Sequence, residues 1–135
     1  MQTNLTVRAE TRTISIAAPP AAVFTLVADG ARLPDWAPAF ASAAEPDGDD
    51  RWLIGTGDAQ FPIRVRADAE HGTVDLLRPA DATVGAFMRV IPNGGGSELL
   101  FTLLFGDEVE PAAVDAQMTT VEGELATVRA LAEGG

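Results

Sequence analysis

Apolar residues in the last part of the chain recur at the spacing of an amphipathic helix. Between residues 111 and 133 they advance in steps of four, three, four and three, at Val114, Met118, Val121, Leu125 and Val128. These steps place the side chains on one narrow stripe of a helix. A helix with such a stripe buries it against another layer of the protein. The pattern therefore predicts a long C-terminal helix that lies across the fold formed by the preceding chain.

A period of two dominates the chain before this helix. In residues 61–69, apolar side chains alternate with Arg64, Arg66 and Asp68, which is typical of an antiparallel strand with one buried face. Similar but weaker patterns predict further strands over residues 11–17, 41–45, 51–56, 73–78, 83–91 and 98–105. We therefore predict an antiparallel sheet that is covered by the C-terminal helix.

The turn after the clearest strand is predicted to be short. His71 and Gly72 suit a two-residue hairpin loop, because glycine adopts positive φ freely and histidine tolerates it better than most residues. Such a loop would place Ala69 opposite Val74, so that apolar side chains face each other across the two strands.

Two registers are open for the last hairpin. If Val90 lies opposite Leu99, Arg89 points to the outer face of the sheet. A slip by one residue turns Arg89 inward instead, because successive side chains point to opposite faces. We favour the first register, because it leaves no charge in the apolar layer.

Two short helical segments are predicted between the first and second strands. Pro19 and Pro20 end the first strand and suit the first turn of a helix over residues 20–29. Residues 31–40 are irregular or form a second short helix, which contains Trp36.

Composition narrows the class of function. The chain has 135 residues, of which 47% are hydrophobic, and this fits a single domain over residues 1–135 with a sizeable core. The net charge of −11 disfavours nucleic acid and anionic lipid surfaces as partners. The sequence has no cysteine, no secretory signal pattern and no apolar run long enough to span a membrane. We therefore expect a cytoplasmic protein.

The order of predicted elements resembles a known superfamily. The segments TISIAAPPAAVFTLVAD (residues 13–29), LPDW (33–36) and AFMRVIPNGGGSELLFTLLF (86–105), followed by the long helix, are similar to the START-like superfamily. This superfamily includes the birch-pollen-allergen-like proteins and the polyketide cyclase/dehydrase group. The resemblance covers about residues 11–133. It implies an α+β helix-grip fold, in which a curved antiparallel sheet wraps around the C-terminal helix and leaves a cavity. We expect no cofactor.

The resemblance also implies which residues face a ligand. They are aromatic residues after the first helix, inner-face residues of the strands and residues of the helix stripe. The set is Trp36, Phe40, Phe61, Ile63, Val65, Arg78, Met88, Phe101, Leu103, Met118, Val121 and Leu125. An arginine at the cavity rim could bind a carboxylate or enolate oxygen. Arg78 has the inner-face parity for this role, and Arg89 has it only in the slipped register.

Few residues suit catalysis or metal binding. His71 is the only histidine and falls in a predicted turn, so we expect neither a histidine base nor a histidine-based metal site. The three serines lack the setting of an activated nucleophile. Asp35 either lines the cavity mouth or is a solvated loop residue. We assign no catalytic residue, and because the C-terminal helix offers no convincing one, any chemistry is expected from the opposite wall.

Three functions stay open. The first is binding of a small hydrophobic or aromatic ligand, lipid- or polyketide-like, in the cavity, and the second is a cyclase/dehydratase-type enzyme acting there. The third is a partner-binding module or homodimer that uses the short side chains on the far face of the helix, at Ala116, Thr120, Gly123, Thr127 and Ala130. We favour the first, because the predicted cavity is apolar and holds few polar groups. Whether the protein is an enzyme stays open.

Overall fold

A computed structural model describes residues 6–134 and shows one seven-stranded antiparallel sheet. In spatial order the strands run β1-β7-β6-β5-β4-β3-β2, so the first strand lies at one edge beside the last strand of the chain. The strands are β1 (Arg8–Ile16), β2 (Ala43–Pro46), β3 (Arg51–Thr56), β4 (Ala59–Asp68), β5 (Thr73–Arg78), β6 (Asp81–Asn93) and β7 (Gly96–Phe105).

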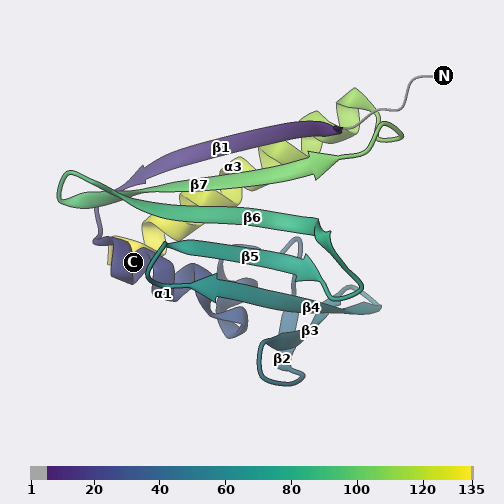
Figure 1. Cartoon of the computed structure of the whole chain (residues 1–135), viewed down its shortest axis with the longest axis horizontal. Helices are drawn as coiled ribbons and strands as arrows, with labels where there is room; N and C mark the ends of the chain where they lie inside the picture. Colours follow the sequence, from purple (N-terminus) through teal and green to yellow (C-terminus); the bar gives the residue numbers. More distant parts are fainter. Residues whose placement is uncertain (1–5, 135) are drawn as a thin grey trace.

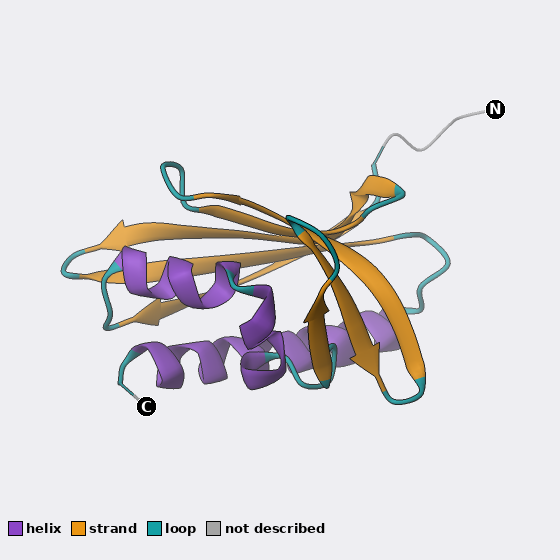
Figure 2. Cartoon of the chain, turned by 90° about the horizontal axis from the view of Figure 1, so that it is seen from below, coloured by secondary structure: helices purple, strands orange, loops and turns teal. Residues whose placement is uncertain are grey.

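The helices lie together on one face of this sheet, which bends around them (Figures 1 and 2). They are α1 (Pro20–Ala28), the 3-10 helix η1 (Gly30–Arg32), α2 (Leu33–Trp36) and α3 (Pro111–Ala132). The predicted α+β architecture with a curved antiparallel sheet and a long C-terminal helix is confirmed. None of the helices in residues 6–134 is long and apolar enough to cross a membrane.

The predicted stripe on α3 is the part of the helix that enters the core. Its five apolar side chains, Val114, Met118, Val121, Leu125 and Val128, are each no more than 2% exposed. The helix packs against β1, α1 and α2. Burial of each such side chain stabilises the fold by about 1.5–3 kcal/mol, so the stripe holds α3 firmly against the sheet.

The last hairpin adopts the register that keeps charge out of the core. Val90 lies opposite Leu99, and Met88 lies opposite Phe101. All four side chains are buried. Arg89, between them on β6, is exposed on the outer face, so the slipped register is excluded.

The hairpin between β4 and β5 differs from the prediction. Asp68 pairs with Thr73, which leaves a four-residue turn over residues 69–72, and Ala67 rather than Ala69 lies opposite Val74. The predicted two-residue turn is therefore wrong. The predicted faces are unaffected, because a shift by two residues preserves which side chains point inward.

Hydrogen bonds of one aspartate explain the longer turn. The Asp68 carboxylate accepts backbone N–H bonds from Glu70 at 3.0 Å and His71 at 3.2 Å, as is typical of an aspartate that initiates a turn. Its second oxygen lies 2.8 Å from Nδ1 of His71. Gly72 then closes the turn with φ of +71°, a conformation that glycine adopts without strain.

A β-bulge interrupts the pairing of β5 and β6 at one end of the sheet. Leu77 pairs with Gly85, but the next residue, Arg78, pairs with Asp81, so residues 82–84 have no partner on β5. A side chain at Gly85 would collide with the carbonyl oxygen of Leu76. Bulges of this kind re-aim side chains at sheet edges, and this one lies at the rim of the cavity described next.

Candidate functional site

A cavity of about 830 Å³ lies between the bent sheet and α3. Its wall includes Leu33 and Trp36 of α2, Phe61 and Ile63 of β4, and Phe101 of β7, with further residues from β5, β6, α3 and the loop before α3. Most of these side chains are hydrocarbon or aromatic. A volume of this size falls in the range of small-molecule sites in proteins, which are typically apolar with a few placed polar groups.

The structure brings seven of the twelve predicted ligand-facing residues to the cavity wall and places five elsewhere. Those on the wall are Trp36, Phe40, Phe61, Ile63, Arg78, Phe101 and Leu103. The other five, Val65, Met88, Met118, Val121 and Leu125, are buried in the hydrophobic core outside the lining.

Helix α1 occupies part of the space that faces the inner side of the sheet. It contacts α3, β5, β6 and β7, and its Val23, Leu26 and Val27 are buried. These side chains belong to the hydrophobic core, as do the five residues outside the cavity lining. Strand alternation identifies the inner face of the sheet, but it does not predict which part of that face another helix covers.

The polar group that sequence reasoning missed is Glu124 of α3, which lines the cavity and is only 8% exposed. Among residues 6–134 its carboxyl group has no hydrogen-bond or ion-pair partner. Burial removes water from the carboxylate and raises its pKa to about 7. Glu124 is therefore a candidate polar group on α3 that the sequence analysis did not identify.

A signal for Glu124 was present in the sequence. Ala113, Gln117 and Glu124 also line the cavity, and they follow one another in steps of four and seven. This spacing defines a second helical face beside the apolar stripe. When such a face borders a buried apolar stripe and contains a single carboxylate, that carboxylate is a candidate for a polar group inside a cavity.

Trp36 contributes a second buried polar group without a partner. Its side chain is 1% exposed and lines the cavity. Its indole Nε1 is buried and has no hydrogen-bond partner among the described residues. Leaving a buried N–H unpaired costs roughly 1–3 kcal/mol. A ligand oxygen that accepted this hydrogen bond would recover part of that cost.

Arg78 lies at the rim of the cavity. Its side chain is exposed, yet its guanidinium carbon is 5.3 Å from the centre of the Phe61 ring, a distance that permits a cation–π interaction. Phe61 in turn meets Phe40 edge to face, with ring centres 5.5 Å apart. Arg89 is on the opposite face of the sheet, and Asp35 is paired with Arg32 at 2.5 Å; neither lines the cavity.

Several exposed apolar side chains belong to the lining of the cavity. The exposed large hydrophobic residues of the described chain are Val7, Val84 and Leu104, at 48%, 47% and 44% exposure, and all three belong to the lining. Val84 lies in the β6 bulge and Leu104 near the end of β7. The exposed part of the lining therefore combines these apolar side chains with the charged residues Arg78 and Glu108.

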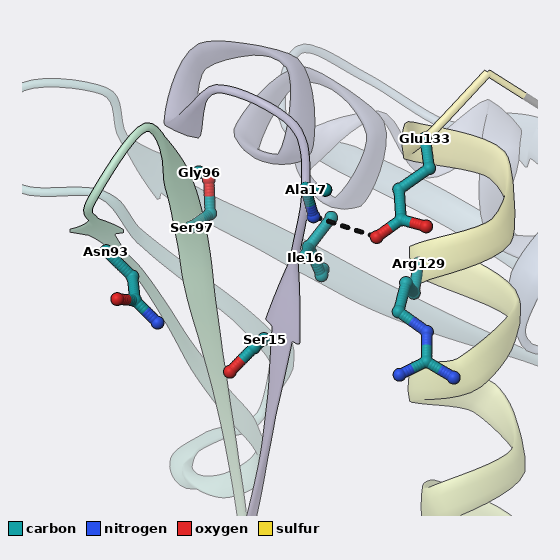
Figure 3. A pocket seen from close by; sticks show the side chains of 8 residues that line it. All are labelled: Ser15, Ile16, Ala17, Asn93, Gly96, Ser97, Arg129 and Glu133. Carbon is teal, nitrogen blue, oxygen red and sulfur yellow. Dashed lines mark hydrogen bonds between the residues drawn. The ribbon is translucent and has the colours of Figure 1, made fainter.

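A second hollow, of about 630 Å³, lies on the surface near the C-terminal end of α3 (Figure 3). Its polar groups are largely occupied by internal hydrogen bonds. The Glu133 carboxylate accepts the N–H of Ala17 at 2.8 Å, and the Ser97 hydroxyl donates to the carbonyl of Ala18 at 2.7 Å. These bonds tie the end of β1 to β7 and α3, so this hollow is a weaker candidate for a site.

The turn between β4 and β5 brings together three groups of the type that bind metals. Ligand atoms of Asp68, Glu70 and His71 lie within 4.8 Å of one another, and all three side chains are exposed. The hydrogen bonds of Asp68 described above account for this arrangement, and they lower the pKa of Asp68, with the His71 ring as the largest cause. None of the three residues lines the cavity.

The far face of α3 offers no additional recognition chemistry. Ala116, Thr120 and Gly123 are exposed. The hydroxyls of Thr119, Thr120 and Thr127 each donate to a backbone carbonyl four residues earlier in the same helix. A homodimer through this face stays a prediction.

Comparison with known proteins agrees with the geometry. Residues 9–133 match a family described as polyketide cyclase / dehydrase and lipid transport. A search among curated proteins finds no match.

Solved structures share the fold at low sequence identity. The XoxI protein of Bacillus cereus has a TM-score of 0.73 at 14% identity, with 93% of this chain and 96% of that chain covered. A START superfamily protein from Mycobacterium smegmatis has a TM-score of 0.70 at 14% identity, with 93% and 97% covered. The di-domain ARO/CYC StfQ of the steffimycin biosynthetic pathway has a TM-score of 0.68 at 19% identity, with 92% and 44% covered.

These similarities establish the helix-grip fold of the START-like superfamily. Because the family match spans nearly the whole chain, the protein belongs to the polyketide cyclase / dehydrase and lipid transport family.

Proposed function

We propose that the protein binds a small hydrophobic or aromatic molecule in the cavity between the sheet and α3. The observation that carries this proposal is the cavity of about 830 Å³ with its mainly apolar wall. The family description and the START-like relatives support ligand binding of this general kind. The unpaired N–H of Trp36 would add orientation by donating to a ligand oxygen.

Binding can be tested with an uncharged fluorescent probe and a variant in which a larger side chain fills part of the cavity. Nile red is expected to bind the protein with an increase in fluorescence. Ala86 lines the cavity from β6, so the larger side chain of Ala86→Trp should fill part of the cavity volume. We expect Nile red binding to weaken at least about tenfold, which corresponds to about 1.4 kcal/mol. The apolar contact area that the probe loses is worth about 25 cal/mol per Å², so a modest loss of area reaches this value.

The matched control is Ala116→Trp, which adds the same side chain on the exposed face of α3. It should leave the affinity unchanged. Equal Nile red binding by both variants, with both folded by circular dichroism, would refute binding in this cavity.

A second function, cyclase- or dehydratase-type catalysis on a ligand in the same cavity, is favoured by Glu124. A buried carboxyl group with a pKa of about 7 can accept or donate a proton near neutral pH, as a general acid or base must. Arg78 at the rim is placed to stabilise negative charge on a ligand oxygen.

Catalysis can be tested with a linear poly-β-ketone thioester. Its aldol cyclisation and loss of water would be followed by mass spectrometry, with and without the protein. Acceleration that disappears in Glu124→Gln and persists in the surface variant Glu45→Gln would support the enzyme. Absence of any acceleration would leave binding as the function.

A further inference from the structure

The charged residues that line the cavity differ in how deeply they are buried. Three charged residues line it: Arg78, Glu108 and Glu124. Arg78 and Glu108 are exposed at the rim, and only Glu124 is buried. The one charge that a bound molecule would meet in the interior is therefore negative.

The Glu124 carboxylate has no hydrogen-bond or ion-pair partner among the described residues. No described lysine, arginine or histidine contacts Glu124, and no described N–H or O–H donates to it. A buried carboxylate without a partner is strongly disfavoured. A cation delivered by a ligand would form a charge-assisted hydrogen bond there, whereas a ligand carboxylate would bring like charges together.

The wall beside Glu124 is also suited to a cation. Trp36, Phe40, Phe61, Phe101 and Phe105 contribute aromatic rings to the same cavity. Aromatic faces attract ammonium groups, most strongly where water is excluded. The net charge of −11 further raises the local concentration of cations at the opening.

We propose that the cavity selects an apolar amine, whose ammonium group pairs with the Glu124 carboxylate while its carbon skeleton packs among the aromatic side chains. The inference rests on the proposed binding function and specifies the ligand class. It excludes fatty acids and other apolar carboxylates as the preferred ligands, because their charged end would oppose Glu124.

Three probes with one ring system separate the alternatives. Isothermal titration calorimetry at pH 8 would compare 2-naphthylmethylamine, 2-naphthalenemethanol and 2-naphthoate. The amine should bind at least about tenfold more tightly than the alcohol, as a charge-assisted hydrogen bond allows. The carboxylate should bind more weakly than the alcohol.

The pH dependence identifies the group responsible. Because the pKa of Glu124 is about 7, its protonation should weaken amine binding about tenfold between pH 8 and pH 6, while alcohol binding stays constant. The other two charged residues of the lining, Arg78 and Glu108, are exposed at the rim, away from the buried carboxyl.

Substitutions complete the test. Glu124→Gln should reduce the preference for the amine over the alcohol to within about threefold and abolish its pH dependence. Glu45→Gln removes the same charge from an exposed site on β2 and should preserve both.

Two outcomes would overturn the inference in different ways. If the alcohol binds and the amine binds no tighter, or if Glu124→Gln keeps the preference, the amine proposal fails and the binding function stands. If none of the three probes nor Nile red binds, the binding function fails, and the amine proposal fails with it. Should Glu124→Gln not fold, the pH dependence of the wild-type protein still decides.

Discussion

Glu124→Gln is expected to stabilise the protein at high pH and to leave its stability almost unchanged at low pH. The side chain of Gln has nearly the shape of Glu but carries no charge, so the substitution removes only the cost of burying the carboxylate. Burial raises the pKa of Glu124 from 4.5 to about 7. A raised carboxyl pKa means that the folded protein holds its proton more tightly than the unfolded chain does.

The sign and size of the effect follow from these two pKa values. Below pH 4.5 the carboxyl is protonated in both states and costs nothing, and above pH 7 the folded protein bears the whole cost of the charge. A difference of about 2.5 pKa units corresponds to roughly 3 kcal/mol. Water that enters the cavity screens the carboxylate, so we expect a smaller gain, of about 1–2 kcal/mol, for Glu124→Gln at pH 8.

Urea unfolding of the wild type and variant at pH 5 and pH 8 measures this difference. Glu45→Gln is the control, because it changes the net charge equally on the surface. A gain that is the same at both pH values, or that appears equally in Glu45→Gln, would show that Glu124 is not desolvated in the folded protein.

Three further predictions concern single positions. Met118→Ala should destabilise the fold by about 2–5 kcal/mol in urea unfolding, because Met118 is buried in the core. The same variant should keep Nile red affinity within about twofold of the wild type, because Met118 does not line the cavity. Gly72→Ala should lower stability by more than about 1 kcal/mol in thermal unfolding. The φ of Gly72 is +71°, and an added Cβ would collide with the carbonyl oxygen of Val90. An unchanged Tm would contradict this prediction. Arg78→Gln should change stability by less than about 1 kcal/mol, since its cation–π contact with Phe61 is exposed, and a larger loss would show that Arg78 has a structural role.

Side-chain alternation was sufficient to predict which residues face inward, but not how far each strand extends along its partner. The register of the last hairpin followed from keeping Arg89 out of the core, because a one-residue slip changes the face of every side chain. The predicted turn after β4 is two residues shorter than the observed turn. The register of the hairpin therefore shifts by two residues, and every side chain keeps its predicted face. Only the hydrogen bonds of Asp68 distinguish these registers.

The candidate site was less predictable, because a cavity depends on what other elements leave unfilled. Met118 and Phe101 both belong to the hydrophobic core, but only Phe101 also lines the cavity. Glu124 adjoins the apolar stripe, and in sequence a charge there resembles the solvated edge of a helix. Its burial depends on how the rest of the fold packs around α3, so the helical spacing alone marks it only as a candidate.

The position of β1 beside β7 has a consequence for folding during synthesis. Arg8 pairs with Phe105, so β1 finds its partner only after almost a hundred further residues have been synthesised. Contacts between such distant segments slow folding, because a long loop must close before they form. Helix α3, which packs on β1 and carries Glu124, emerges later still. A nascent chain that is stopped after β7 would therefore present the sheet without the helix that supplies part of the cavity lining.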